Sequence, residues 1–300
     1  MKNQGKAYIY AILTVLLWST VATAFKIALR EFDFYNFVCF SSLTAAMALF
    51  AAVIFSGKLK ELRATTYRDL AKSALLGFLN PFAYYLVLFK AYDILPAQEA
   101  QPLNYVWPIM LVLISIPLLK QKISWLSLLA IIVSFTGVLV ISTHGKLLDM
   151  KFSNGQGAAL ALGSSLIWAF FWIFSMKDHR DETVKLFLSF AFGFIFSLIA
   201  CIIFSKPVFV FSYSGLAVVY AGLFEMGITF LLWSKALKYS VTTARVSNFI
   251  FASPFLSLIG IYFVIGEKIL PSTIAGLILI VAGIVLQQYA GRKSTIPRIK

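Results

Sequence analysis

Glu225 is an acidic residue in a strongly apolar part of the chain. It lies about ten residues into the apolar stretch Gly215–Ser234, and a helix rising about 1.5 Å per residue would place its carboxyl near the centre of a bilayer. Charged groups at that depth cost free energy and usually serve a pathway or a partner. Aligning Lys90 with Lys235 sets Asn80 opposite Glu225. The carboxyl is suited to bind a cationic group or a proton; the alternative is an uncharged Glu hydrogen-bonded to a neighbouring helix.

Two tryptophans, Trp18 and Trp168, also fall near the middle of apolar stretches, although Trp usually prefers the membrane interfaces. Two indoles that face a shared cavity would provide flat apolar walls and N–H donors for an aromatic or amphipathic substrate. The alternative is that both indoles only fill space in a helix bundle.

Three prolines in apolar stretches, Pro81, Pro108 and Pro254, are expected to kink their helices. A proline removes one backbone hydrogen bond and frees a carbonyl, which membrane proteins tolerate where that carbonyl lines a cavity. Polar and aromatic side chains gather beside these positions: Asn80 and Tyr84 at the first, Asn104, Tyr105 and Trp107 at the second, and Asn248 and Ser253 at the third. We interpret these side chains as the lining of a substrate pathway, against the alternative of purely structural kinks.

The elements that must position these side chains are membrane helices. The chain is 60% hydrophobic and 13% charged, with a mean hydropathy of +0.88, and a soluble domain of 300 residues cannot bury that much apolar surface. Apolar runs bounded by charged or turn residues predict an all-α membrane protein with ten transmembrane helices. They run at about Tyr8–Leu29, Tyr35–Ser56, Leu70–Phe89, Gln98–Leu119, Trp125–Ser142, Gly157–Met176, Val184–Ser205, Gly215–Ser234, Ala244–Ile265 and Ser272–Ala290.

The second half of the chain repeats features of the first half. Lys90, Pro108, Lys122 and Gly137 recur 145 or 146 residues later as Lys235, Pro254, Lys268 and Gly283. We therefore divide the chain into two five-helix repeats, residues 1–145 and 152–300, which form one transport unit with its site between them. Because five is an odd number, the second repeat enters the membrane from the opposite face, so the repeats are predicted to be inverted.

Two five-helix repeats, each with Trp in its first helix and Pro in its fourth, resemble the EamA-type transporters of the drug/metabolite transporter superfamily. The stretch Asn104-Tyr105-Val106-Trp107-Pro108 is similar to one in the aromatic amino-acid exporter branch. The resemblance covers essentially the whole chain and implies a ten-helix carrier that moves small organic metabolites by alternating access. It leaves the substrate open, since relatives carry amino acids, nucleotide sugars, drugs and other metabolites.

The basic residues indicate the orientation in the membrane. With the N-terminus inside, 19 of the 26 Lys and Arg residues fall on the cytoplasmic side. This bias predicts a multi-pass protein of the cell membrane with both termini in the cytoplasm. The net charge of +14 is therefore a topology signal, and nucleic acid is not an expected partner. Cys39 and Cys201 fall inside predicted helices, so a disulfide framework is not indicated.

The fifth and tenth predicted helices carry small residues in place of polar ones. Ala130 and Gly137 align with Gly276 and Gly283, seven residues apart on one helix face. Small residues let helices approach closely, so we expect these helices to pack and not to line the pathway; a homodimer contact is the alternative use of this face. Lys26, near the end of the first helix, is expected to reach the headgroups or, alternatively, to bind a substrate carboxylate.

Enzyme motifs are missing from the sequence. It contains neither a nucleotide-binding phosphate loop nor H-E-x-x-H, and we expect no catalytic residue, metal or cofactor. The leading hypothesis is a secondary transporter that exports amino acids or similar amphipathic, amine-bearing solutes. A small-molecule substrate and the lipid bilayer are its expected partners, and proton coupling is a hypothesis that rests on Glu225 alone. The alternatives are a carrier of nucleotide sugars, phosphate esters, organic cations or drugs and, more remotely, a channel or a membrane enzyme.

Overall fold

Every regular element in the described part of the chain is helical. The computed structural model describes residues 3–107, 109–110, 113–114, 118, 125–146, 154–240 and 248–293. The first half contains α1 (Gln4–Ala28), α2 (Phe34–Phe55), α3 (Leu59–Arg63), α4 (Tyr67–Gly77), η1 (Phe78–Ala83), α5 (Tyr84–Ile94), α6 (Ala97–Asn104) and α8 (Trp125–Ser142). The second contains α9 (Gly155–Met176), α10 (Glu182–Phe204), α11 (Tyr213–Ala221), η2 (Gly222–Gly227), α12 (Ile228–Tyr239), η3 (Asn248–Ala252), α14 (Ser253–Gly260), η4 (Ile261–Ile265) and α15 (Pro271–Lys293).

In the described part of the chain, six helical segments are long and apolar enough to cross a membrane. They are Gln4–Ala28, Phe34–Phe55, Tyr67–Ile94, Gly155–Ser175, Glu182–Phe204 and Tyr213–Ala236, and shorter apolar helices cover Leu128–Ser142, Ser253–Ile265 and Pro271–Leu286. Each predicted span overlaps one of the described helices, and α8 has the predicted bounds. The all-helical fold is therefore confirmed, while the number of membrane crossings stays a prediction.

Polar caps begin corresponding helices of the two halves. Asn3 accepts a hydrogen bond at the start of α1, and Asn154 does so at the start of α9. Asp33 and Asp181 accept two backbone N–H groups each at the starts of α2 and α10. The first N–H groups of a helix lack partners within it, so such residues stabilise the helix starts.

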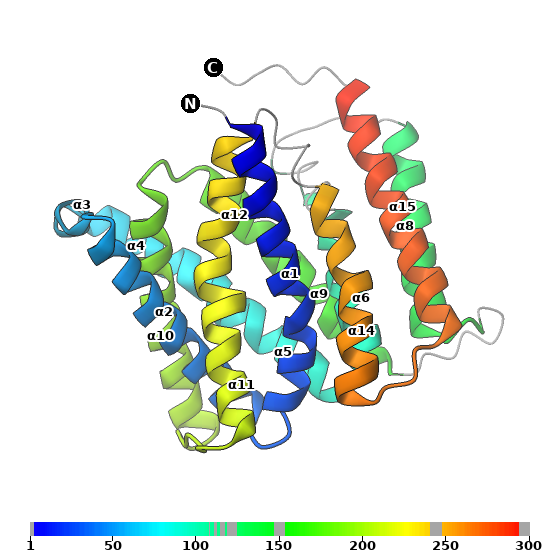
Figure 1. Cartoon of the computed structure of the whole chain (residues 1–300), viewed down its shortest axis with the longest axis horizontal. Coiled ribbons are helices and arrows are strands. Elements are labelled where there is room, and N and C mark those ends of the chain that lie inside the picture. Colours follow the sequence, from blue (N-terminus) through cyan, green and yellow to red (C-terminus); the bar gives the residue numbers. More distant parts are fainter. Residues whose placement is uncertain are drawn as a thin grey trace.

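The helices form two outer pairs around a central group (Figure 1). On one side α2 packs against α10, and on the other α8 packs against α15. Between the pairs, α1 packs against α11, α12 and α14, while α9 packs against α5 and α6. α1 begins beside the end of α12, where the Asn3 N–H donates to the Tyr239 carbonyl over 2.9 Å, and α15 ends at this same end of the molecule (Figure 1). Helices from both halves thus surround the centre.

Small residues bring α8 and α15 together. A Cβ added to Gly137 would lie 2.5 Å from the carbonyl oxygen of Gly276, and one added to Gly283 would lie 2.7 Å from that of Ala130. Contacts at this distance leave no room for a side chain, so the two antiparallel backbones touch. The packing role expected of these helices is what the structure has. Because these small residues already serve contact within the chain, a homodimer stays a prediction and would need another face.

In the described residues, corresponding helices of the two halves are interrupted, by a kink at Asn80 in η1 and by the π-helical segment η2. η1 separates α4 from α5, and η2 separates α11 from α12. Asn80 in η1 has non-helical backbone angles (φ −148°, ψ 119°) and is followed by Pro81. π-helical turns inside helices are frequent at functional sites because they redirect the side chains that follow. Pro81 therefore stands at a break in its helix, as expected.

Pro254 differs from the expected kink within a continuous helix. It stands in the first turn of α14, directly after the 3₁₀ helix η3. In the first turn of a helix the N–H groups have no acceptor within the helix, so a proline there costs no hydrogen bond. Pro254 therefore begins a helix instead of bending one. Pro102 lies inside α6, a position that the sequence analysis did not single out. Pro108 lies outside the described residues.

Candidate functional site

A cavity of about 60 Å³ lies between the two halves of the chain. α1, α5 and α6 line it from the first half, and α9, η2, α12 and η3 line it from the second half. The lining residues are Trp18, Val21, Phe25, Tyr84, Leu88, Tyr92, Gln101, Asn104, Tyr105, Trp107, Trp168, Trp172, Glu225, Trp233 and Ile250. Predicted site residues from distant parts of the sequence therefore meet in one place.

Aromatic rings form most of the cavity wall. Five of the six tryptophans of the chain line it, among them Trp18 and Trp168. The Phe230 ring lies edge-on to both of these indoles, with ring centroids 6.4 Å from Trp18 and 5.5 Å from Trp168. Trp168 also packs against Tyr84, at 4.6 Å between centroids. Aromatic pairs at such separations stabilise one another and hold the rings in place, so the wall is a packed aromatic shell.

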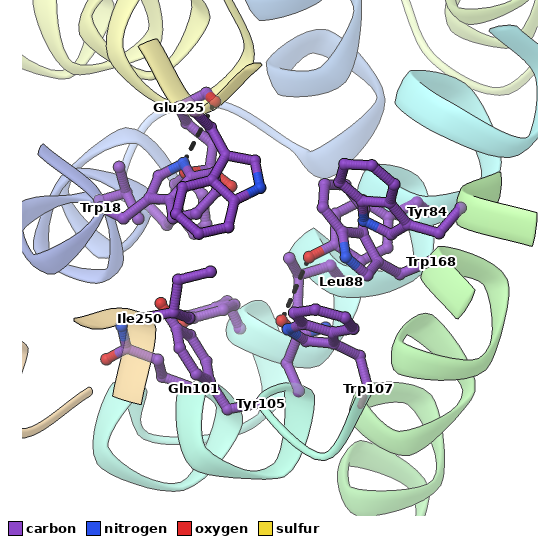
Figure 2. A pocket seen from close by; sticks show the side chains of 15 residues that line it. Trp18, Tyr84, Leu88, Gln101, Tyr105, Trp107, Trp168, Glu225 and Ile250 are labelled. Carbon is purple, nitrogen blue, oxygen red and sulfur yellow. Dashed lines mark hydrogen bonds between the residues drawn. The ribbon is translucent and has the colours of Figure 1, made fainter. Parts of the chain in front are cut away.

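Glu225 is the charged residue of this lining. Figure 2 shows it beside Trp18, across the cavity from Tyr84 and Trp168. Its side chain is 8% exposed. The Tyr85 hydroxyl donates to its Oε1 over 3.0 Å, while its Oε2 is buried and has no hydrogen-bond partner. The Trp18 indole donates to the backbone carbonyl of Glu225 over 3.5 Å. One carboxyl oxygen is thus left for a ligand, since a buried oxygen without a partner is costly.

A polar chain crosses the opposite wall. The Tyr84 hydroxyl donates to Asn104 Oδ1 over 3.1 Å, and Asn104 Nδ2 donates to Ser164 over 2.9 Å. This chain ties α5 to α6 and α6 to α9. Ser257 on α14 donates to the side-chain oxygen of Gln101. The amide oxygens of this wall are therefore already engaged within the protein.

Several predicted site residues lie elsewhere. Asn80 is fully buried with both side-chain polar atoms unpartnered, but it is absent from the lining, so the structure does not bring it to Glu225. Ser253 is buried at the start of α14, also outside the lining. Asn248 lies in η3, and the structure does not describe its side chain. Tyr105 and Trp107 do line the cavity.

Tyr85 and Trp233 belong to the site without a signal predicted from the sequence, and Gln101 and Trp172 line the cavity without having been predicted site residues. Tyr85 was passed over because Tyr84 matches a regular four-residue spacing from Asn80, and η1 breaks that spacing. Trp172 was detectable, since it follows Trp168 at that same spacing along α9. Its indole nitrogen is buried without a partner, so it is a second group that could bind a ligand.

Charged cavities adjoin the central cavity at both of its ends. One shares Tyr92 and is lined by Lys26, Arg30, Asp93 and Glu267, at the ends of α1 and α5. The other shares Trp172 and includes Lys58, Asp178, Asp181, Lys185 and Lys235, at the ends of α9 and α12. α1 begins beside the end of α12 and finishes near Lys26, so the two charged cavities lie at opposite ends of the molecule. Each shares one lining residue with the central cavity.

Lys26 binds backbone carbonyls at the end of α5, while its expected reach to the headgroups stays a prediction. Its Nζ donates to the carbonyl oxygens of Tyr92 and Leu95, over 2.6 Å and 2.7 Å. A lysine can satisfy the carbonyls left free at a helix end, and here it binds the end of α5. Lys26 therefore holds α1 against α5, and its ammonium group is turned away from the central cavity.

Residues from the two halves bind one another at this end. Glu267 accepts the backbone N–H groups of Ala97 (2.9 Å) and Gln98 (3.2 Å) at the start of α6. The Gln98 side chain accepts from the Leu270 N–H and Thr273 hydroxyl and donates to the Lys268 carbonyl, all within 2.9–3.0 Å. We call this set, Gln98 and Glu267 with their partners, the α6 latch. It closes the side of the cavity from which α6 begins.

An ion pair lies at the opposite end of the molecule, in the wall of the charged cavity that includes Lys58. Lys58 Nζ lies 2.6 Å from Asp181 Oδ2. Burial raises the pKa of Asp181. The Lys58 ammonium and the N–H groups of Val184 and Thr183 together lower it by more than burial raises it, so this pKa lies below its ordinary value. Asp181 is therefore ionised at neutral pH, and the pair links the end of α2 to the start of α10.

Metal binding has no structural basis in the described residues. This part of the chain contains no group of three or more His, Cys, Asp and Glu side chains that could hold a metal ion. Cys39 and Cys201 are free thiols, both buried.

The family model of EamA-like transporters matches this chain twice, over residues 5–143 and 155–287. The chain belongs to the EamA-like transporter family. The predicted superfamily is thereby confirmed, and its aromatic amino-acid exporter branch stays a prediction. Family membership and the apolar helices also make this a multi-pass membrane protein. The two matched segments meet at the central cavity.

Relatives of this EamA-like chain carry names that agree with the family. An uncharacterized transporter of Clostridium kluyveri is 24% identical over 301 positions, covering 96% of this chain and 95% of its own length. An uncharacterized transporter of Archaeoglobus fulgidus is 26% identical over 292 positions, covering 93% and 97%. A protein of known crystal structure is 21% identical with a TM-score of 0.68 over 98% of this chain and 100% of its own. At that identity, the likeness is one of fold.

Proposed function

We propose that this EamA-like protein is a secondary transporter that exports amphipathic, amine-bearing solutes, amino acids among them, by alternating access. The observation that carries the proposal is the buried carboxylate of Glu225, with a free oxygen, in an aromatic cavity between the two matched segments. A buried carboxylate needs a partner. An ammonium group supplies it, and the rings bury the apolar body of the solute.

Inverted repeats of five helices support alternating access. The segments η1 and η2 interrupt corresponding helices, and Asn3 and Asn154, like Asp33 and Asp181, cap corresponding helices. α1 ends at the Lys26 cavity, whereas α9 ends at the Lys58 cavity on the opposite side. Such pairing is expected of ten membrane helices in two repeats, residues 1–145 and 152–300, of opposite orientation, with the site between them.

Orientation and partners follow from the same proposal. We place both termini in the cytoplasm and the protein in the cell membrane, because the basic residues are distributed unevenly between its faces. The α6 latch then faces the outside. Protons are a proposed second ligand of Glu225, which a solute amine would displace.

Opening of the α6 latch is a required step, because the latch joins the two halves. Replacing Glu267 by Ala removes the acceptor of two N–H groups at the start of α6, and losing a helix cap costs about 1 kcal/mol, or roughly fivefold in an opening equilibrium. We expect Gln101→Cys, a reporter in the cavity, to react about fivefold faster with a membrane-impermeant maleimide in the Glu267→Ala background.

Glu267→Gln is the matched control for this prediction. It keeps one of the two acceptor oxygens, for the N–H of Ala97 or of Gln98, and is expected to react at a rate between those of Glu267→Ala and Glu267 itself. Labelling from outside intact cells tests the orientation as well. Equal rates in the Ala and wild-type backgrounds would contradict a gating role for the latch.

The experiment that tests the function compares metabolites inside and outside cells that overproduce the wild type, Glu225→Gln or no protein. Glu61→Gln, in the exposed helix α3, is a control with the same change of charge. We expect one class of amine-bearing metabolites to accumulate outside with the wild type and with Glu61→Gln only. If the same metabolites also leave cells that produce Glu225→Gln, as they do with the wild type and Glu61→Gln, Glu225 has a structural role. No difference from control cells, with folded protein in the membrane, would contradict export.

The alternatives would show themselves in other measurements. Export of nucleotide sugars or phosphate esters would replace the proposed substrate class. Single-channel currents in a planar bilayer would identify a channel, because carriers turn over too slowly to produce them. Turnover of a solute by the purified protein without a gradient would indicate an enzyme.

A further inference from the structure

We propose that the central cavity selects organic monocations that carry an aromatic body and no carboxylate, such as arylalkylamines, over the corresponding amino acids. This inference rests on the proposed function and narrows its substrate class. It follows from what each wall of the cavity has left to offer a ligand.

The aromatic wall suits a cation and a flat apolar group equally. Trp18, Trp168, Trp172 and Trp233 line the same cavity as Glu225. A cation within about 6 Å of an indole face is attracted to the ring, most strongly where water is excluded. The same faces stack on an aromatic ring of the ligand. An arylalkylamine presents both groups, an ammonium at one end and a ring at the other.

Among the described lining residues, one carboxyl group, that of Glu225, can carry a charge toward a ligand. Glu225 lines the cavity, and its Oε2 is buried without a hydrogen-bond partner. The ligand that satisfies it carries one positive charge and an N–H donor. A second, negative group on the ligand would be buried close to the same carboxylate, and like charges in a site of low dielectric repel one another strongly.

Among the described lining residues, the donors left for a ligand carboxylate are neutral, such as the Trp172 indole N–H, and no basic group is free to hold it. Lys26, the basic residue considered for that role, gives its ammonium to the carbonyls of Tyr92 and Leu95. Asn104 donates its amide to Ser164. The Tyr84 and Tyr85 hydroxyls donate to Asn104 and Glu225. An amino acid would therefore leave its carboxylate with neutral partners or compete with these bonds, and burying an anion without a cationic partner is costly.

A matched set of three ligands tests the inference on the wild-type protein. 2-Phenylethylamine has the ring and the ammonium, phenylalanine adds a carboxylate, and 3-phenylpropionate has the carboxylate without the ammonium. Binding to purified protein is followed by calorimetry and by the tryptophan fluorescence of the cavity. We expect the dissociation constant of 2-phenylethylamine to be lower than that of phenylalanine by about tenfold or more. We expect 3-phenylpropionate not to bind, and Glu225→Gln to lower the affinity for the amine by roughly 30-fold or more.

The outcomes separate this inference from the proposed function. If phenylalanine binds as tightly as the amine, the cavity recognises the carboxylate, the inference fails and amino-acid export stands. If neither compound binds, the inference also fails, and the metabolite comparison decides the function by itself. Retained amine binding by a folded Glu225→Gln protein would overturn the role of the carboxylate in the selection. Trp168→Leu keeps Glu225 but removes a ring from the wall. It is expected to weaken binding of the amine and to leave the order of affinity of the three ligands unchanged.

Discussion

Purified Glu225→Gln protein is expected to lose nearly all affinity for the transported amine. Gln keeps the shape of the side chain and can still accept the hydrogen bond from Tyr85, but the negative charge is gone. Removing one partner of a buried charge pair costs about 2–5 kcal/mol, so the dissociation constant should rise roughly 30-fold or more. Binding to detergent-solubilised protein and exchange of labelled substrate in proteoliposomes measure the two consequences.

Tyr85→Phe is the control that separates charge from hydrogen bonding. It removes the 3.0 Å bond to Oε1 and leaves the carboxylate in place. We expect a loss of only about 0.5–1.5 kcal/mol in binding, the usual net value of one hydrogen bond. If Tyr85→Phe lowered the binding affinity as much as Glu225→Gln does, the hydrogen bond between Tyr85 and Glu225, and not the charge, would account for the loss. Wild-type affinity in a folded Glu225→Gln protein would contradict the role of the carboxylate in binding.

Gly137→Val is expected to have the largest effect on stability. Even its Cβ would lie 2.5 Å from the Gly276 carbonyl oxygen and 2.9 Å from the backbone nitrogen of Ile280. The backbone of α15 cannot move aside as a flexible side chain would, and overpacking costs about 1–3 kcal/mol, occasionally more. We expect the unfolding midpoint in detergent to fall by about 5 °C or more and the yield of folded protein to drop.

Gly163→Val provides the matched substitution. Gly163 lies inside α9, and a Cβ built there meets no atom within 4 Å. The same change of residue should therefore leave the midpoint nearly unchanged. Equal destabilisation by both variants would mean that helix propensity, and not the contact between α8 and α15, determines the loss. Gly276→Val offers a second test from the other side of that contact, because its Cβ would lie 2.6 Å from the Gly137 carbonyl oxygen.

Much of the fold was predictable from composition and periodicity. Apolar runs located a helix near every predicted span, because lipid allows a helix to be apolar on all sides and leaves the charged residues at its ends. The repeated Gly137 and Gly283 indicated close packing, because only small residues let two backbones touch. The bounds were less accurate where η1 and η2 divide a helix, because a kink or a π-helical turn changes the spacing without changing hydrophobicity.

The candidate site was predictable in part. Glu225 and Trp18 stood out because their side chains are unusual at mid-membrane depth, and both line the cavity. Asn80 stood out on the same grounds and lies outside the lining, because its extended backbone angles turn the helix there. Tyr85 gave no signal, since its hydroxyl reaches Glu225 across 140 positions of sequence.

The sequence by itself determined the class of the protein: membrane helices, two related halves, and a carboxyl group buried where its charge needs a partner. These follow from local properties, namely hydropathy, repetition and the cost of burying charge. The tertiary structure alone decided which groups face the ligand. It turns Lys26 to the end of α5, engages Asn104 with Tyr84 and Ser164, and leaves one oxygen of Glu225 free among tryptophans. These side-chain arrangements depend on contacts between segments that are far apart in the sequence. Only the packing of the helices brings those segments together.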